Sequence, residues 1–177
     1  MTRGWPIATS TYTAFRWPLI ALLTAIGLVW LLAFYLPLRR ERQAIHDFVE
    51  RGREVVVLAD VSRIPEILAK EVAFRGEHEQ ATLTSAKMTE RAQEFFRHTR
   101  MTKLEILKET IDIVAGATTA GVRLKVRAKI TDSTLNVEGS EDLNVTLELV
   151  RTNPGSAWAV QAMAVKALRP GGGDENG

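Results

Sequence analysis

Residues 19–36 form a run of 18 residues, LIALLTAIGLVWLLAFYL, without a charged side chain. About 20 helical residues, each rising roughly 1.5 Å, are enough to cross the hydrocarbon core of a bilayer. Trp17 and Tyr35 lie near the two ends of the run, where aromatic rings prefer the membrane interface. Arginines among residues 39–42 follow it and can extend their charges to the headgroups. The sequence therefore predicts a transmembrane helix over residues 17–38.

A cleaved signal peptide and a buried core helix are the two other interpretations of this run. A signal peptide has a shorter apolar core that is followed by a small-residue cleavage site, and the sequence shows neither feature. A buried core helix is disfavoured because a complete separate domain follows the run. We expect a single-pass membrane protein whose first partner is the lipid bilayer. Thr24 and Gly27 form one small-residue pair, which alone does not predict helix dimerisation.

The charged residues are divided unevenly between this run and the rest of the chain. Residues 1–38 hold two arginines and no acidic residue, so 21 of the 23 Lys and Arg accompany 21 Asp and Glu in the remainder. A nucleic-acid-binding domain needs a clear surplus of Lys and Arg to displace phosphate counterions. No nucleic-acid partner is therefore expected. The sequence has no cysteine, which excludes disulfides, thiolate nucleophiles and cysteine-ligated metals.

Five arginines follow the apolar run within residues 39–53, whereas only Arg3 and Arg16 precede it. The positive-inside rule therefore favours a cytoplasmic location for the rest of the chain. Glu41 and Asp47 offset part of this excess, so a periplasmic location stays open. The expected division is an N-terminal extramembrane segment (1–16), the transmembrane helix (17–38), a soluble α+β domain (39–169) and a disordered tail (170–177).

Residues 39–59 are expected to continue as a helix beyond the membrane, because apolar side chains recur at every third or fourth position. The apolar stripe of this helix comprises Ile45, Phe48, Val49, Gly52, Val55, Val56 and Ala59. Ser62 is suited to cap a second helix with Pro65 in its first turn, where a missing N–H costs nothing. The buried side of that second helix is expected to consist of Ile64, Ile67, Leu68 and Val72.

The helical spacing fails around Gly76, where a loop or a short strand is expected. Thr84 or Ser85 then opens a third helix, because both side chains cap helices well. The apolar side of this third helix comprises Met88, Ala92, Phe95 and Phe96.

Beyond residue 101 the apolar period changes from about 3.6 residues to 2, which is typical of half-buried strands. Apolar and polar residues alternate over residues 122–130 and 143–149, and residues 158–168 form a further strand. An Asn-Pro-Gly turn at residues 153–155 joins the last two strands. Together with a strand upstream, these short connections favour an antiparallel meander of four strands.

The strand upstream of these three contains a change of phase. Leu104 and Ile106 share one phase, whereas Ile111 and Ile113 share the other. A slip of one residue within a single strand predicts a β-bulge, which bends the strand strongly.

The order of these elements resembles the NTF2-like, or cystatin-like, α+β cone over residues 40–168. The cues are Phe95 and Phe96 at a helix end before the bulged strand, and the closing hairpin from Val150 and Arg151 to Trp158, Ala159 and Val160. The resemblance implies about three helices packed on a bent four-stranded antiparallel sheet. The family includes isomerases, dehydratases, transport factors and membrane-tethered subunits of secretion machines. Fold alone does not choose among these functions.

Enzymes of this family carry an acid/base pair, commonly Asp with His or Tyr, inside the cone, where burial shifts pKa values toward neutrality. His46 and Asp47 flank the apolar stripe of the first helix, and His46 is expected to lie in solvent. His98 follows a helix end, and Asp112 should face away from the core because it lies between two isoleucines. Residues 77–79, Glu-His-Glu, alternate between faces if extended. We therefore assign no catalytic residue, metal ligand or cofactor-binding residue.

The alternating cations of one strand, Arg123, Lys125, Arg127 and Lys129, form a basic ladder. One interpretation of this ladder is an electropositive strip for anionic lipid or an acidic partner. The other is an ordinary solvated strand face that Glu148 and other carboxylates partly neutralise. The second interpretation is favoured.

The leading hypothesis is a non-enzymatic membrane protein whose soluble domain serves as an interaction or assembly module. It would be an accessory subunit of a larger membrane complex, in a bacterial inner membrane. Other subunits of that complex are the expected partners, and the resemblance adds a homodimer that forms through the sheet. The alternative is a membrane-tethered, small-molecule-binding or catalytic cone that uses His46, Asp47 or His98.

Overall fold

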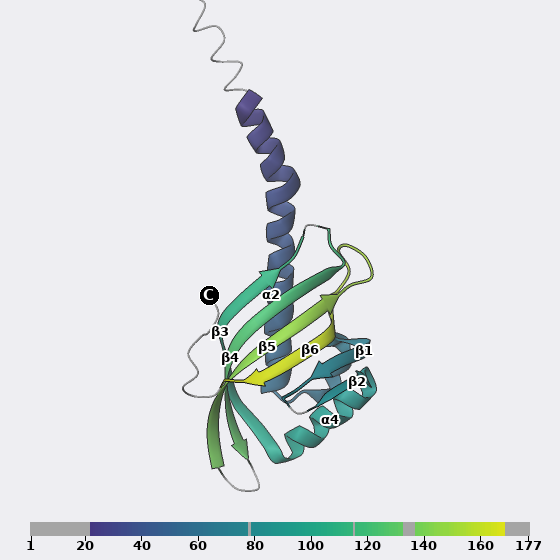
Figure 1. Cartoon of the computed structure of the whole chain (residues 1–177), viewed down its shortest axis with the longest axis vertical. Helices are drawn as coiled ribbons and strands as arrows, with labels where there is room; N and C mark the ends of the chain where they lie inside the picture. The colour runs from purple at the N-terminus through teal and green to yellow at the C-terminus, as the bar shows by residue number, and fades with distance from the viewer. Residues whose placement is uncertain (1–21, 78, 115, 133–136, 169–177) are drawn as a thin grey trace, which may run out of the picture.

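The computed structural model describes residues 22–77, 79–114, 116–132 and 137–168, and shows an α+β fold (Figure 1). A long N-terminal helix leads into a domain in which a curved sheet partly surrounds the lower half of that helix. The predicted segment 1–16, the first residues of the predicted span and the predicted tail 170–177 lie outside the described residues.

One continuous helix runs from Leu22 to Val57 and is interrupted only by a π-helical turn, η1 (Leu31–Tyr35). None of its most apolar 18-residue window is buried against the rest of the described chain. By length and composition this part of the helix could cross a membrane. No loop separates it from α2 (Leu36–Val57), which belongs to the folded domain.

The helix α2 buries one apolar stripe and leaves its other sides to solvent. Ile45, Phe48, Val49 and Val55 are buried, which confirms most of the predicted stripe. Ala59 is instead exposed and has a φ of 52°. It ends the helix as the left-handed residue of a Schellman motif, in which Asp60 N–H donates to the Val55 carbonyl over 3.0 Å.

The predicted second helix is wrong beyond its first turns. A short 3-10 helix, η2 (Val61–Arg63), and one helical turn, α3 (Ile64–Ile67), lead directly into a strand, β1 (Leu68–Arg75). This strand pairs with β2 (Gln80–Thr84) through a tight hairpin in which Gly76 N–H donates to the Glu79 carbonyl over 2.8 Å. Pairing with distant strands has overridden the local helical spacing of Leu68 and Val72.

The third predicted helix is confirmed as α4 (Ser85–His98). Its N-cap is Thr84, whose hydroxyl oxygen accepts a hydrogen bond from the Lys87 backbone N–H over 3.4 Å. Met88, Ala92 and Phe96 are half-buried, but Phe95 is exposed, so the predicted apolar side of this helix is only partly covered.

The sheet has six strands instead of the predicted four, in the order β2-β1-β6-β5-β4-β3. The four predicted strands are β3 (Thr99–Asp112), β4 (Thr119–Asp132), β5 (Val137–Val150) and β6 (Ala159–Ala167). They pair antiparallel and in sequence order, which confirms the predicted meander. The added hairpin joins by a parallel pairing of β1 with β6, so the sheet is mixed.

The predicted bulge lies in β3. The register of β3 on β4 shifts between Ile106 and Lys108, and Leu107 is left unpaired and exposed. A second shift falls between Met101 and Lys103. Such irregularities increase the bend of a strand, which is consistent with the curvature of the sheet around α2 in Figure 1.

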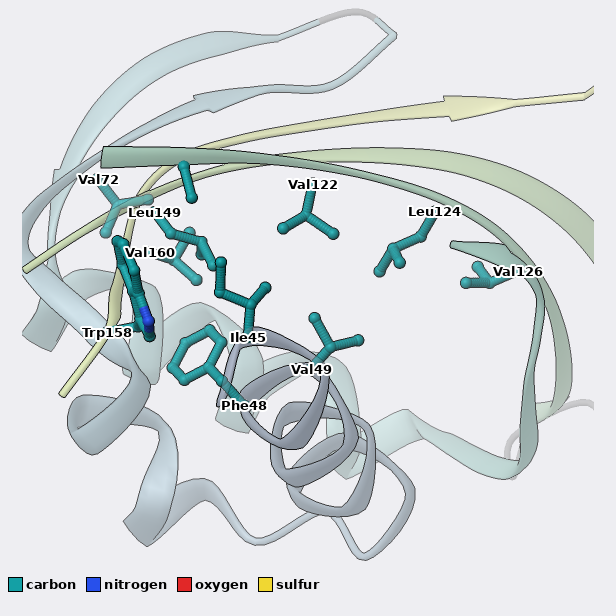
Figure 2. Close-up of a cluster of buried hydrophobic side chains, with 11 residues drawn as sticks. Ile45, Phe48, Val49, Val72, Val122, Leu124, Val126, Leu149, Trp158 and Val160 are labelled. Atoms are coloured by element: carbon teal, nitrogen blue, oxygen red, sulfur yellow. The ribbon is translucent and has the colours of Figure 1, made fainter. Parts of the chain in front are cut away.

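The hydrophobic core fills the space between α2 and the concave face of the sheet (Figure 2). Val49 points from the helix toward Val122 and Leu124 on β4, whereas Ile45 and Phe48 point toward the other end of the cluster. The remaining buried members of this core are Val72, Ala120, Val126, Leu149, Trp158 and Val160. Most of this apolar area comes from strands far from α2 in the sequence, so the helix and the sheet depend on each other for stability.

A buried ion pair connects the beginning of α2 to the sheet. The Arg151 side chain is 2% exposed and donates two hydrogen bonds of 2.8 Å to the carboxylate of Glu41, which is 17% exposed. Its guanidinium also donates to the Ala117 carbonyl over 2.8 and 3.0 Å, and lies 4.3 Å from the centre of the Trp158 ring. A buried guanidinium must be paired, so this contact holds α2, the β3–β4 loop and the β5–β6 hairpin together.

Replacing Glu41 by Gln should reduce the free energy of unfolding by about 3–5 kcal/mol, because it leaves the Arg151 charge buried without a counter-charge. The measurement is urea unfolding of the full chain in detergent micelles, followed by far-UV circular dichroism. Glu50→Gln is the control, because Glu50 forms a half-exposed pair with Arg53 on the same helix, and it should cost about 1 kcal/mol or less. Equal losses in the two variants would contradict a structural role for the buried pair.

Candidate functional site

The concave face of the sheet carries mostly apolar side chains and is covered by α2. Figure 2 shows the side chains of Ile45, Phe48 and Val49 in the space between α2 and the sheet. Polar chemistry on this face must therefore take place at the edge of the apolar cluster and not at its centre.

Glu109 brings a carboxylate onto this covered face. In the register of β3 on β4 it lies opposite Leu124, two pairs along from Ile111 and Val122 and therefore on the same face. Its side chain is 17% exposed, and its Oε2 lies 2.6 Å from Nδ1 of His46 on α2. Its other oxygen, Oε1, is buried and has no hydrogen-bond donor among the described residues. A buried acceptor without a donor costs free energy, so this carboxylate is a candidate functional group.

The Glu109 carboxylate favours the protonated form of His46. The pKa of His46 is raised above its ordinary value, mainly by the hydrogen bond to Glu109. Desolvation opposes this rise, and the negative charges of Glu109, Glu50 and Asp47 add to it. Because the folded-state pKa is raised, the contribution of the pair to stability is complete below the unfolded pKa of about 6.5. It is lost as the pH rises through the folded-state pKa.

The structure revises the expectation for His46, which is not free in solvent. Its side chain is 44% exposed and reaches across to β3. Asp47, its neighbour on α2, is exposed and accepts a hydrogen bond of 2.9 Å from Gln43 on the same helix. His98 is exposed at the last position of α4. The residue that the sequence interpretation missed is Glu109.

The missed carboxylate had a signal in the sequence. The phase slip between Ile106 and Ile111 moves every residue after the bulge to the other face of β3. Glu109 follows the slip and shares the phase of Ile111 and Ile113, so it belongs on the covered side with them. Asp112 takes the opposite phase, and its exposed position confirms the prediction that it faces away from the core.

Glu77 and Glu79, of the acidic stretch at residues 77–79, lie between β1 and β2. Glu77 and Glu79 are exposed, and His78 lies outside the described residues. Among the residues that the structure describes, no group of three His, Asp or Glu side chains is arranged to hold a metal ion.

The other face of the sheet carries the basic ladder, and Figure 1 views the molecule from this side, with α2 behind the strands. We call it the open face. Arg123 donates to Asp112 on β3 over 2.9 Å. Arg127 binds both carboxylate oxygens of Asp142 on β5, over 2.7 and 3.0 Å. This double hydrogen bond lowers the pKa of Asp142 and raises that of Arg127.

These ion pairs support the interpretation that carboxylates of neighbouring strands partly neutralise the ladder. The partners differ from the expected one, however. Glu148 lies opposite Gly121 on β4 and Ala162 on β6, and forms no ion pair with the described residues. It lines an open depression of about 510 Å³ together with small side chains of β1 and β6, among them Ala73 and Ala164.

Comparison with known proteins identifies the fold. No protein-family profile and no curated protein matches the chain. An NTF2-like superfamily protein from Salmonella enterica is 11% identical with a TM-score of 0.63, and the match covers 76% of this chain and 95% of that one. For a putative scytalone dehydratase from Novosphingobium aromaticivorans the identity is 14%, the TM-score 0.62 and the two coverages 75% and 87%.

A third similar structure is an NTF2-like protein of unknown function in nutrient uptake from Rhodospirillum rubrum, which is 18% identical. Its TM-score is 0.58, and the match covers 70% of this chain and 98% of that one. At such identities the likeness establishes the fold alone. The domain therefore has an NTF2-like fold, which confirms the resemblance. Because the similar structures include proteins named as enzymes and proteins without a known function, the fold does not assign an activity.

Replacing Glu109 by Gln should lower the pKa of His46 toward its ordinary value, because the hydrogen-bonded carboxylate is the main cause of the rise. The measurement is an NMR titration of the imidazole C–H signals of the full chain in detergent micelles. The chain has three histidines, and His46→Asn identifies the relevant signal. Asp47→Asn is the matched control and should move this pKa less. A His46 pKa that is unchanged in Glu109→Gln would show that the pair does not form in solution.

Proposed function

We propose that the chain is a membrane-anchored, non-enzymatic interaction module and an accessory subunit of a larger membrane complex. The observation that carries this proposal is the division of the sheet into two unlike faces. The face under α2 is filled by its own core, whereas the open face is polar and bears no helix of the described chain. A broad uncovered sheet face on an anchored domain is suited to binding another protein.

The anchoring part of the proposal depends on the apolar helix. Leu22, Leu23, Ile26, Val29 and Trp30 are each more than half exposed in the structure. A helix that is apolar on all sides and uncovered needs an apolar environment, and the hydrocarbon core of a bilayer supplies one. The arginines that follow it favour a cytoplasmic domain on a bacterial inner membrane as the working orientation.

The connection between helix and domain gives the open face a defined orientation. The apolar helix continues into α2 without a loop, and α2 is fixed to the sheet by its core contacts and by the Glu41–Arg151 pair. The domain is therefore held rigidly on its anchor, so a partner in the same membrane meets the open face at a fixed height and angle. The proposed partner is another subunit of the complex, and a second copy of the chain is the alternative.

Photocrosslinking in native membranes tests this proposal. A benzophenone amino acid at Thr146, which is exposed on β5 in the middle of the open face, should crosslink to one reproducible protein. The same amino acid at Gln93, which is exposed on α4, should not crosslink to that protein. The membranes are first washed at alkaline pH, and the chain should stay in the pellet until detergent is added.

Three outcomes would contradict the proposal. Release of the full chain by the alkaline wash would disprove the anchor. Equal crosslinking from Thr146 and Gln93 would show that the open face is not a specific interface. A crosslinked species of twice the mass of the chain, without any other protein, would establish a homodimer in place of a complex with another subunit.

A catalytic cone is the second candidate function, and the His46–Glu109 pair favours it. A partly desolvated carboxylate with one unpaired oxygen is a reasonable general base, and the imidazolium next to it is a reasonable acid. Such a pair suits proton abstraction next to a carbonyl group.

Hydrogen exchange separates the two candidates. When the full chain is incubated with a cell metabolite extract in deuterated water, we expect mass spectrometry to show no deuterium incorporation that depends on the protein. Incorporation with the wild-type chain that is lost in Glu109→Gln and retained in Asp47→Asn would favour the enzyme.

A further inference from the structure

We infer that the open face contains a docking site for an acidic, extended segment of the partner protein. The inference rests on the proposed function, because it names the chemistry of the partner that the open face would bind. The site is a row of three lysines that crosses the strands, Lys108, Lys125 and Lys166, which we call the lysine row.

The sheet register places these lysines in line. Lys108 on β3 lies directly opposite Lys125 on β4, which lies opposite Asn144 on β5, which in turn lies opposite Lys166 on β6. The neighbours of Lys125 along β4 are Leu124 and Val126, which are buried on the other face. The side chain of Lys125 is therefore on the open face, and the register places the rest of the row beside it.

The lysine row has no counter-charge in the described part of the chain. The ion pairs on each side of it along β4 belong to Arg123 with Asp112 and to Arg127 with Asp142. The charge of Lys125 contributes to lowering the pKa of Asp142, so the two residues are close. Both carboxylate oxygens of Asp142 are already bound by Arg127, however. The two arginines of the ladder are thus neutralised, and Lys125 between them is not.

Such an arrangement is unfavourable for the isolated domain. Like charges directly opposite each other on neighbouring strands are destabilising, and Lys108 and Lys125 are such a pair. Lysines that prevent aggregation are typical of edge strands, whereas β4 is an inner strand of this sheet. A ligand with several negative charges would remove the repulsion and turn it into attraction.

The surface around the row is shaped for carboxylates. An open depression of about 580 Å³ is lined by Lys108 and Lys125 together with Thr110, Asn144 and Thr146. Ammonium groups form charge-assisted hydrogen bonds with carboxylates, and neutral amide and hydroxyl groups add donors. Strands lie about 4.8 Å apart, so the row extends over roughly 14 Å. In an extended peptide, carboxylates on alternate residues are about 7 Å apart, so three of them match this length.

The position of the row disfavours a lipid surface as the occupant. Lys125 lies six positions after Thr119, the first residue of β4, which is roughly 20 Å along the strand. The β4 end at Thr119 adjoins the β3–β4 loop, which lies beside the anchored helix in Figure 1. The attraction of charged headgroups decays over about 8–10 Å. A second copy is also disfavoured, because it would bring three further lysines to the same surface.

Fluorescence anisotropy with a labelled peptide tests the inference. The probe is the pentapeptide Glu-Gly-Glu-Gly-Glu, and Gln-Gly-Gln-Gly-Gln is the uncharged control peptide. The full chain in nonionic detergent should bind the acidic probe at low salt and lose affinity steeply as salt is added. The triple variant K108Q/K125Q/K166Q should bind it at least tenfold more weakly. The triple variant K70Q/K87Q/R97Q removes the same charge from exposed positions on β1 and α4, and should change the affinity less than twofold.

Other results would overturn the inference. One such result is an equal loss of affinity for the acidic probe in the two triple variants, and another is equal binding of the two peptides by the wild-type chain. A third is binding of the wild-type chain to nanodiscs containing phosphatidylserine, if only K108Q/K125Q/K166Q abolishes that binding. A homodimer that dissociates only in that variant would also overturn it. If K108Q/K125Q/K166Q still crosslinks to the partner from Thr146 and the probe does not bind, the inference fails while the proposed function stands. If the probe binds through the lysine row but Thr146 crosslinks to no protein, the proposed function fails instead.

Discussion

The rest of the structure depends on the junction of α2 with the sheet, and one buried cation, Arg151, lies at this junction and must be neutralised there. A guanidinium shielded from water must find acceptors nearby. Here the acceptors come from Glu41 at the beginning of α2 and from the Ala117 carbonyl in the β3–β4 loop, and the Trp158 ring lies against its face. These groups are far apart in the sequence. Satisfying this charge therefore brings together the helix, the loop and the final hairpin.

Most of the fold could be predicted from local patterns, because its longest elements have clear periods. Alternation in β4 and β5 identified both strands, and the phase slip in β3 identified the bulge before Lys108. The β1–β2 hairpin was missed because Leu68 and Val72 also fit a helical spacing. What makes that segment a strand is its pairing with β2 and β6, and the partner residues on β6 are about 90 positions away. Pairing between residues so far apart produces no local pattern in the sequence.

The candidate sites were less predictable than the fold, because both depend on register. His46 was correctly noted as the histidine beside the apolar stripe, but its partner Glu109 is 63 residues away. Following the phase slip through to Glu109 would have placed that carboxylate on the covered face. The basic ladder is visible as alternation along one strand. Which of its cations are neutralised depends on Asp112 and Asp142 of the neighbouring strands, and that requires knowing which residues lie opposite each other.

The π-helical turn η1 has a consequence for how the apolar helix can meet other helices. A π turn contains more residues than an α turn, because its hydrogen bonds connect residues five positions apart. The side chains before Leu31 are therefore rotated about the helix axis relative to where a regular α-helix would place them. The apolar stripe of α2 therefore does not indicate on which side of the helix Thr24 and Gly27 lie. In the proposed anchor, the side available to a neighbouring helix is therefore set independently of the side that α2 turns toward the sheet.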